Sequence, residues 1–153
     1  MTTNGPDLWF SFVRAHRLII REVERRLADA GLPTYAWYDV LWGLESGPGG
    51  KRRMHELADA LVIERYNLTR LVDRLESEGL VTRTRSADDG RAAFLTITRE
   101  GRALRKKMWK IYQGTIADLF LSQFDPADER RFADALERAA QAVRAAAAVS
   151  RPS

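Results

Sequence analysis

The order of residue patterns within residues 54–101 limits the fold of this chain more than any other feature. Residues 55–61 carry apolar side chains at helical spacing. A second helical pattern follows, with its apolar side chains on one face at Leu68, Leu71, Val72 and Leu75. Gly79 then stands where a glycine often ends a helix. Two short helices joined by a tight turn bury little surface alone, so we expect them to pack on a larger helical body.

Two strand-like runs come next, on either side of an Asp-Gly dipeptide at residues 89–90 that favours a tight hairpin turn. The first run begins at Leu80. In the second run, Leu95 and Ile97 alternate with threonines, which is the period of a strand. Thr98 can cap the helix that follows. The whole segment therefore predicts a helix-turn-helix followed by a hairpin wing.

The outer face of the second predicted helix carries side chains that can contact DNA. These residues are Arg65, Tyr66, Asn67, Thr69, Arg70 and Arg74. An arginine can form two hydrogen bonds with guanine and an asparagine two with adenine, and each such pair contributes about 1–3 kcal/mol of base discrimination. Arg91, at the tip of the predicted hairpin, suits insertion into a narrow minor groove, where the negative potential is high. The pattern therefore indicates double-stranded DNA as a partner.

These motifs resemble those of the MarR family of winged-helix transcription regulators. The matching residues are 32–41, 56–58, 61, 69–76, 79–81, 83, 88–91, 95–98 and 101. The resemblance covers nearly the whole chain. It implies a mainly α fold with a small β wing, and it adds Arg83 to the DNA-binding residues. It also implies a sequence-specific regulator of transcription.

Two positions depart from the family pattern. Val62 stands in the turn, where family members often have glycine, and Glu64 stands at the start of the second helix, where they often have serine. The negative charge of Glu64 can still favour a helix N-terminus, although a carboxylate repels phosphate. The backbone contacts of the family at this point therefore need not carry over to this chain.

The rest of the chain has helical patterns. We expect helices over residues 7–30, 34–45, 99–123 and 126–149. Thr34 is the expected cap of the second of these, and Asp125-Pro126 is a strong signal for the start of the last. Residues 47–50 read as a loop, and the basic side chains of residues 51–53 either contact phosphates or are solvated. We expect a single domain in which residues 34–98 bind DNA and residues 7–31 and 99–149 form a helical dimerisation region.

The terminal helices indicate a partner chain, because both carry apolar faces that the short DNA-reading unit cannot cover. In the last helix this face comprises Phe132, Leu136, Ala139, Ala140 and Val143. We expect a twofold homodimer, as the family resemblance also implies; the alternative is a monomer with the terminal helices folded back on its own body. A twofold dimer predicts a pseudo-palindromic operator with half-sites about one DNA turn apart.

The resemblance also implies a small ligand, since MarR-like proteins commonly bind aromatic or phenolic anions between the dimer helices and the DNA-reading region. The candidate ligand-binding residues are Phe12, His16, Arg17, Trp37, Tyr38, Trp42, Trp109 and Tyr112. A histidine, a tyrosine hydroxyl and an arginine among aromatic rings would suit an aromatic carboxylate. The alternative is that these aromatic residues form the core, which we favour for Trp37.

Composition excludes several other kinds of site. The chain has no cysteine, which rules out disulfides and thiol redox sensing, and its two histidines, His16 and His55, are far apart. We therefore expect no metal site, no cofactor and no enzyme activity. No apolar run is long enough for a transmembrane helix, and the first residues lack the pattern of a signal peptide, so we expect a cytoplasmic protein.

A net charge of +4 is mild for a DNA-binding protein, so the basic residues must be well placed rather than abundant. The favoured interpretation is a repressor that an aromatic ligand releases from its operator. A ligand-independent regulator and an architectural DNA-binding protein are the alternatives, and the sequence does not separate activation from repression.

Overall fold

The computed structural model describes residues 5–85 and 93–151 of the chain. The chain divides into two compact units, Met1–Thr115 and Ile116–Ser153. The first unit holds α1 (Gly5–Asp29), α2 (Tyr35–Glu45), α3 (Met54–Leu61), α4 (Arg65–Ser77), the small sheet and most of α5 (Arg99–Leu119). The second holds the end of α5, η2 (Leu121–Gln123) and α6 (Pro126–Val149). The predicted mainly α fold with a small β wing is confirmed.

The sheet has three antiparallel strands in the order β1-β3-β2: β1 (Lys51–Arg53), β2 (Val81–Arg85) and β3 (Ala93–Ile97). The wing strands pair from Val81 opposite Ile97 onwards, as the hairpin pattern predicts. The sequence pattern predicts no strand at residues 51–53, but these residues pair with β3, starting with Lys51 opposite Thr96. A short 3-10 turn, η1 (Pro48–Gly50), precedes them.

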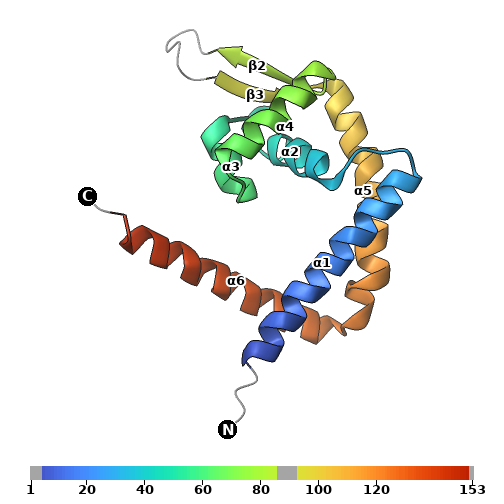
Figure 1. The fold of residues 1–153 in the computed structure, drawn as a ribbon, viewed down its shortest axis with the longest axis vertical. Coiled ribbons are helices and arrows are strands. Elements are labelled where there is room, and N and C mark those ends of the chain that lie inside the picture. The colour runs from blue at the N-terminus through green and yellow to red at the C-terminus, as the bar shows by residue number, and fades with distance from the viewer. Residues whose placement is uncertain (1–4, 86–92, 152–153) are drawn as a thin grey trace. The chain divides into compact units, whose positions relative to one another are not determined.

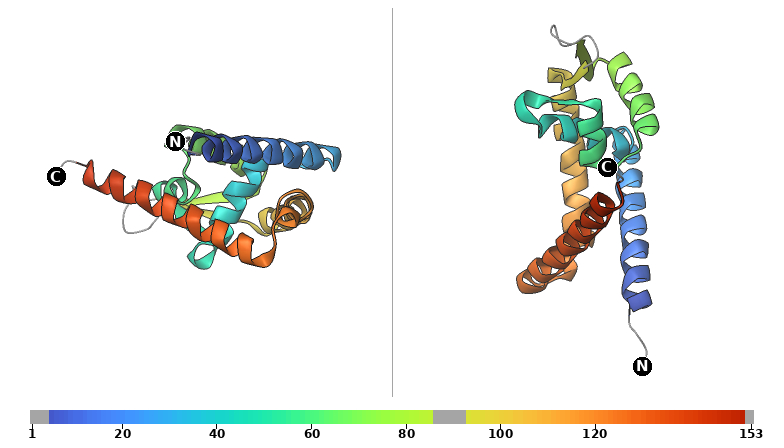
Figure 2. Two further views of the ribbon diagram at one scale, coloured as in Figure 1. Left: turned by 90° about the horizontal axis from the view of Figure 1, so that it is seen from below. Right: turned by 90° about the vertical axis from the view of Figure 1, so that its left-hand side faces the viewer.

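The core of the first unit lies where α2, α3 and α4 meet the sheet. In Figure 1 and Figure 2, α2 lies at the centre, with α3, α4 and the hairpin around it. Its fully buried side chains include Val40, Leu41, Leu44, Leu57, Leu68, Val72, Leu75, Val81 and Leu95. Burying one such leucine contributes roughly 1.5–3 kcal/mol. The apolar face of α4 is thereby fixed inward, which turns its polar face outward.

Thr98 joins the end of α4 to the start of α5. Its hydroxyl Oγ1 accepts a hydrogen bond from the Gly101 backbone N–H at 3.0 Å, as the cap prediction requires, and donates to the Gly79 carbonyl at 2.8 Å. Gly79 has a φ of +73°, which a glycine adopts without steric cost. A Cβ on Gly101 would overlap the carbonyl oxygen of Leu80, so this helix passes very close to the end of α4.

The helix α2 begins at Tyr35, with Thr34 at its N-cap position. The predicted cap is wrong in its chemistry, because the Thr34 side chain makes no capping hydrogen bond. Instead, the Tyr35 backbone N–H donates to Glu24 Oε1 of α1 at 3.2 Å. A side chain from another helix therefore satisfies one of the free N–H groups at this end.

The helix α5 ends at Leu119, earlier than the predicted residue 123. Pro126 holds Asp125 extended, with a φ of −76° and a ψ of 164°. Phe124 is extended as well, with a φ of −119° and a ψ of 141°. In the second unit, the Phe124 ring packs against Phe120 and Phe132, with ring centroids 5.2 and 5.5 Å away. Asp125 caps α6 as predicted, by accepting a hydrogen bond from the Asp128 N–H at 2.9 Å.

None of the helices in the described part of the chain combines the length and the apolar character needed to cross a membrane.

Candidate DNA-reading surface and aromatic cluster

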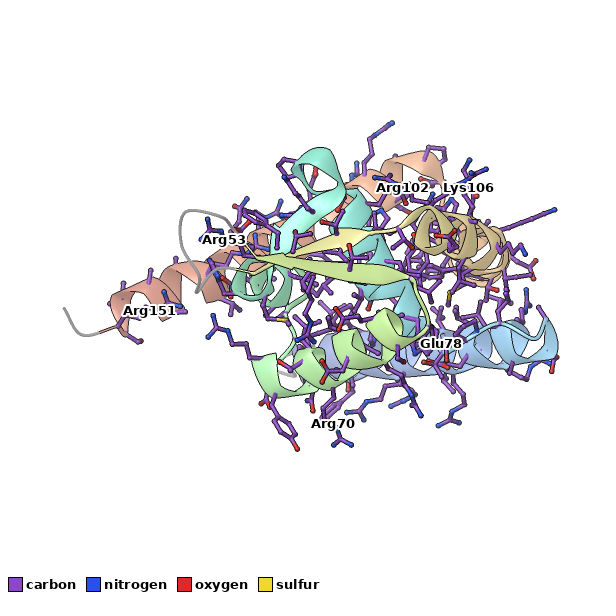
Figure 3. All side chains as sticks on the ribbon, turned by 90° about the horizontal axis from the view of Figure 1, so that it is seen from above. Arg53, Arg70, Glu78, Arg102, Lys106 and Arg151 are labelled. Carbon is purple, nitrogen blue, oxygen red and sulfur yellow. The ribbon has the colours of Figure 1, made fainter. Side chains whose placement is uncertain are left out.

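The exposed face of α4 carries all six residues that the sequence predicts for DNA contact on this helix. Arg65, Tyr66, Asn67, Thr69, Arg70 and Arg74 are exposed. Leu68, Val72 and Leu75 hold the opposite face in the core. Figure 3 shows Arg70 projecting from α4 on the side turned away from the sheet. The helix can therefore present these side chains to DNA without losing its packing.

Two of these residues are ordered by their neighbours. The Arg70 guanidinium lies 5.9 Å from the centroid of the Tyr66 ring, within range of a cation–π contact. The Thr69 hydroxyl donates to the Arg65 carbonyl at 2.8 Å, which turns its proton away from any outside partner. A surface hollow over the middle of α4 is lined by Asn67, Arg70, Leu71, Asp73 and Arg74.

Arg83 of β2 is held by carboxylates of α4. It forms an ion pair with Asp73, and its Nε lies 3.8 Å from Glu76 Oε2. Because these contacts occupy the guanidinium, Arg83 ties the wing to α4. Arg91, the residue predicted for the minor groove, lies outside the described residues.

The basic residues of β1 have different roles. Arg52 Nε donates to the Gly43 carbonyl of α2 at 2.7 Å, which is a structural contact. Lys51 and Arg53 both lie over the Phe94 ring, 5.2 and 4.9 Å from its centroid. Sequence reasoning missed Phe94 as a platform, because the pairing of β1 with β3 joins segments far apart in the sequence.

The structure brings together three of the predicted ligand residues, Tyr38 of α2 with Trp109 and Tyr112 of α5. The centroid of the Tyr38 ring lies 5.8 Å from that of Trp109 and 5.1 Å from that of Tyr112. Tyr35, which the sequence analysis missed, completes this aromatic cluster: its ring is 5.1 Å from that of Tyr112, and the two hydroxyl oxygens are 3.2 Å apart. Its position at the start of α2, one turn before Tyr38, was the available signal.

Burial raises the pKa of three groups in and beside the aromatic cluster, namely Tyr35, Tyr38 and Asp39. It raises the pKa of Tyr35, and the hydrogen bond with Tyr112 raises it further. Burial also raises the pKa of Tyr38, although a hydrogen bond from Arg105 opposes the shift. For Asp39, burial raises the pKa of the carboxyl while a hydrogen bond from Tyr35 lowers it. Tyr35 and Tyr38 therefore keep their phenolic protons at neutral pH.

The cation beside Tyr38 is Arg105 of α5, which also forms an ion pair with Glu45 of α2. The residue chosen from the sequence for this role, Arg17, is exposed on α1. A second arginine pairs with the same carboxylate: Arg102 Nη1 lies 3.3 Å from Glu45 Oε1. The charge next to the aromatic cluster is thus already paired with a carboxylate.

The other predicted ligand residues lie elsewhere. Phe12 and His16 contact each other on α1, with ring centroids 6.5 Å apart, and within the described ranges no ring contact joins them to the aromatic cluster. Trp37 packs against the core, as favoured. Trp42 is 49% exposed, and within the described ranges no ring contact joins it to the aromatic cluster.

Among the residues that the structure describes, no group of three or more His, Asp or Glu side chains is placed to hold a metal ion.

Comparison of the sequence with known proteins finds similarity to transcriptional regulators. The model of the MarR family matches residues 33–92. The HTH-type transcriptional regulator SarZ of Staphylococcus aureus is 27% identical over 124 residues, which span 81% of this chain and 82% of SarZ.

Solved structures agree over nearly the whole chain. AbsC, a MarR family transcriptional regulator from Streptomyces coelicolor, superposes with a TM-score of 0.85 at 26% identity and covers 95% of this chain and 97% of its own. Sco3205, a MarR family transcriptional regulator from the same organism, was solved in complex with DNA. It superposes with a TM-score of 0.83 at 26% identity and covers 93% of this chain and 89% of its own. CouR from Rhodococcus jostii RHA1, solved with bound p-coumaroyl-CoA, superposes with a TM-score of 0.74 at 25% identity and covers 90% of this chain and 94% of its own.

Proposed function

We propose that this MarR-family winged helix-turn-helix transcriptional regulator acts as a homodimer whose two α4 helices read the halves of a pseudo-palindromic operator. The observation that carries this proposal is the outward face of α4. Arg65, Asn67 and Arg70 are exposed there, on a helix whose other face is fixed in the core. These are the side chains that pair best with guanine and adenine in the major groove.

Large apolar side chains that remain exposed on the terminal helices support the dimer. On α1, Leu8, Trp9 and Phe10 are exposed, with Trp9 at 61%. On α6, Val143 and Leu136 are exposed as well. Several large apolar side chains left exposed on one helix are typical of an interaction site. We assign residues 7–31 and 99–149 to the dimerisation region and residues 34–98 to DNA binding.

Repression relieved by a small aromatic ligand is the regulatory mode that we propose. The ligand would bind at the edge of the aromatic cluster, where the ring of Trp109, which is 39% exposed, supplies apolar surface. A carboxylate bound there would compete with Glu45 for the guanidinium of Arg105, beside the Tyr38 hydroxyl. CouR supports this mode, since its structure contains an aromatic acyl thioester. This assignment leaves α1 to the dimer interface.

The first test is binding of the full chain to the DNA immediately upstream of its own gene, measured by fluorescence anisotropy against a scrambled duplex at near-physiological salt. We expect nanomolar affinity for the first duplex and micromolar affinity for the second. Equal, strongly salt-dependent binding to both duplexes would instead indicate an architectural DNA-binding protein.

A second titration tests the ligand. Adding a series of hydroxybenzoic acids to the complex should lower the DNA affinity by a factor of about 5–150, and DNA should weaken binding of the same acid by an equal factor. An acid that binds equally well with and without DNA, or a series in which none binds, would favour a ligand-independent regulator.

A further inference from the structure

Three helices of the first unit end in the same backbone conformation, but only one of them does so without glycine. A residue one or two positions past the helix has a positive φ in each case: +71° at Gly31 after α1, +73° at Gly79 after α4 and +56° at Val62 after α3. Glycine adopts this left-handed conformation at no steric cost. Val62 is the one residue other than glycine with a positive φ among residues 5–85 and 93–151.

The hydrogen bonds at the end of α3 form a complete Schellman motif. The Ile63 N–H donates to the Ala58 carbonyl at 3.1 Å, and the Val62 N–H donates to the Asp59 carbonyl at 3.4 Å. Ile63 packs against the core, as the residue after such a cap commonly does. These contacts hold Val62 at a φ of 56° and a ψ of 48°. For a β-branched side chain this conformation is a strained outlier.

Packing within the chain does not explain the valine. Its side chain is 85% exposed, so its two methyl groups gain little contact with the rest of the molecule. A glycine at this position would remove the strain, as Gly31 and Gly79 do at the other two helix ends. Strain held at an exposed position is typical of residues that act on a partner.

The position of Val62 suggests what that partner is. It lies two residues before Glu64, the N-cap of α4, and it therefore precedes the end of the helix whose residues contact base edges in helix-turn-helix proteins. The Glu64 side chain makes no capping hydrogen bond, and its carboxylate disfavours a phosphate at this place. An exposed apolar group in the major groove finds one apolar partner on the bases, the 5-methyl group of thymine.

We propose that Val62 is a specificity-determining residue whose side chain contacts the 5-methyl group of a thymine in each half of the operator. This inference rests on the proposed role of α4 as the DNA-reading helix. It adds an apolar contact, made from the turn, to the hydrogen bonds that Arg70 and Asn67 can form.

Uracil substitution tests the contact directly, since uracil lacks only the methyl group. Duplexes are first selected from a random pool by the full-length protein, and each thymine of the selected duplex is then replaced by uracil in turn. The wild-type protein should bind about fourfold more weakly at one thymine per half-site, the effect of burying one methyl group. The Val62→Gly variant should bind the thymine and uracil forms equally at that position.

Thermal unfolding of the same variants separates strain from recognition. Val62→Gly should raise Tm by about 2–4 °C, because the strain is removed. Gly31→Val is the matched control: it places the same side chain at the corresponding position after α1, where a Cβ would meet no atom within 4 Å. It should lower Tm and keep the preference for thymine over uracil.

The outcomes distinguish this inference from the function on which it rests. If the protein selects a sequence but Val62→Gly keeps the wild-type ratio of affinities for thymine and uracil, the proposed contact is wrong and the role of α4 stands. The same holds if the selected half-site contains no thymine, or if Val62→Gly weakens both forms equally. If the wild-type protein selects no sequence, the proposed function fails together with the contact.

Discussion

Arg83 of β2 forms an ion pair with Asp73 of α4, and this contact joins strand β2 of the wing to helix α4. The family resemblance placed Arg83 among the DNA-binding residues. The structure gives Asp73 a partner on another element, with Glu76 as a second carboxylate near the same guanidinium. We therefore assign Arg83 the task of setting the angle between wing and helix.

Neutral variants of this pair should behave as one unit. Arg83→Gln and Asp73→Asn are each expected to lower the free energy of unfolding by about 0.2–1 kcal/mol, as for other exposed ion pairs, and the double variant by no more than either one. A phosphate contact would contribute about 0.9 to the slope of log affinity against log salt. We expect Arg83→Gln to change this slope by less than about 0.9. A change of about 0.9 would mean that Arg83 contacts a DNA phosphate.

Two glycines of α5 should respond oppositely to alanine. A Cβ at Gly101 would overlap the Leu80 carbonyl oxygen and come within 2.9 Å of Ile97 Cγ1, so Gly101→Ala should destabilise the protein by about 1–3 kcal/mol. At Gly114 no atom lies within 4 Å of the added Cβ, and alanine should stabilise the helix by about 0.5–1 kcal/mol. Urea unfolding measures both values, and equal effects at the two sites would contradict the close packing at Gly101.

The buried carboxyl of Asp39 should make stability depend on pH. Burial raises its pKa above the ordinary value of 3.8. Below 3.8 both the folded and unfolded states hold the proton, and the carboxyl contributes nothing to pH dependence. As the pH rises above that value, the unfolded chain ionises first and stability falls until the folded state has also ionised.

Asp39→Asn removes this ionisation and keeps an oxygen that can accept the hydrogen bond from Tyr35. The variant should therefore gain stability relative to the wild type as the pH rises from about 4 to neutrality. Urea unfolding at several pH values gives the difference directly. A difference that does not change with pH would mean that Asp39 keeps its ordinary pKa in the folded protein.

The exposed apolar face of α1 should control dimer formation. Trp9→Gln is expected to weaken the dimer at least tenfold, because a large aromatic side chain at an interface typically contributes about 2 kcal/mol or more. Arg14→Gln changes an exposed α1 residue outside the apolar stripe and serves as the control. Sedimentation over a range of concentrations reads out both variants, and similar dimer affinities for the two would argue against a dimer built on this face.

Local signals were sufficient for much of the fold. The Asp125 cap, the Thr98 cap and the turn at Gly79 depend on residues within a few positions of each other, and the structure confirms all three. The polar face of α4 follows in the same way from the spacing of its buried residues. Such features can be predicted because the residues that form the hydrogen bond or the turn are neighbours in the sequence.

The remaining features depend on contacts between distant segments. Strand β1 exists because Lys51 pairs opposite Thr96, and no pattern in three basic residues predicts this. Arg105 is the cation beside Tyr38 of the aromatic cluster because α5 packs against α2. The sequence suggested Arg17 on α1 instead, because Arg17 is next to His16 in the chain. Val62 went unrecognised as a left-handed residue because valine is among the side chains least suited to that conformation.

The most direct test of the account is the ratio of affinities of Arg70→Ala for a selected operator and for a scrambled duplex. Lys106→Ala is the matched control, since it removes an exposed charge from α5 rather than from the reading face of α4 (Figure 3). We predict that Arg70→Ala lowers the ratio by a factor of about 5–150, the equivalent of one bidentate base contact, and that Lys106→Ala leaves the ratio unchanged. If Arg70→Ala weakens both duplexes equally, Arg70 contacts only the DNA backbone, and the claim that α4 reads sequence through this face is contradicted.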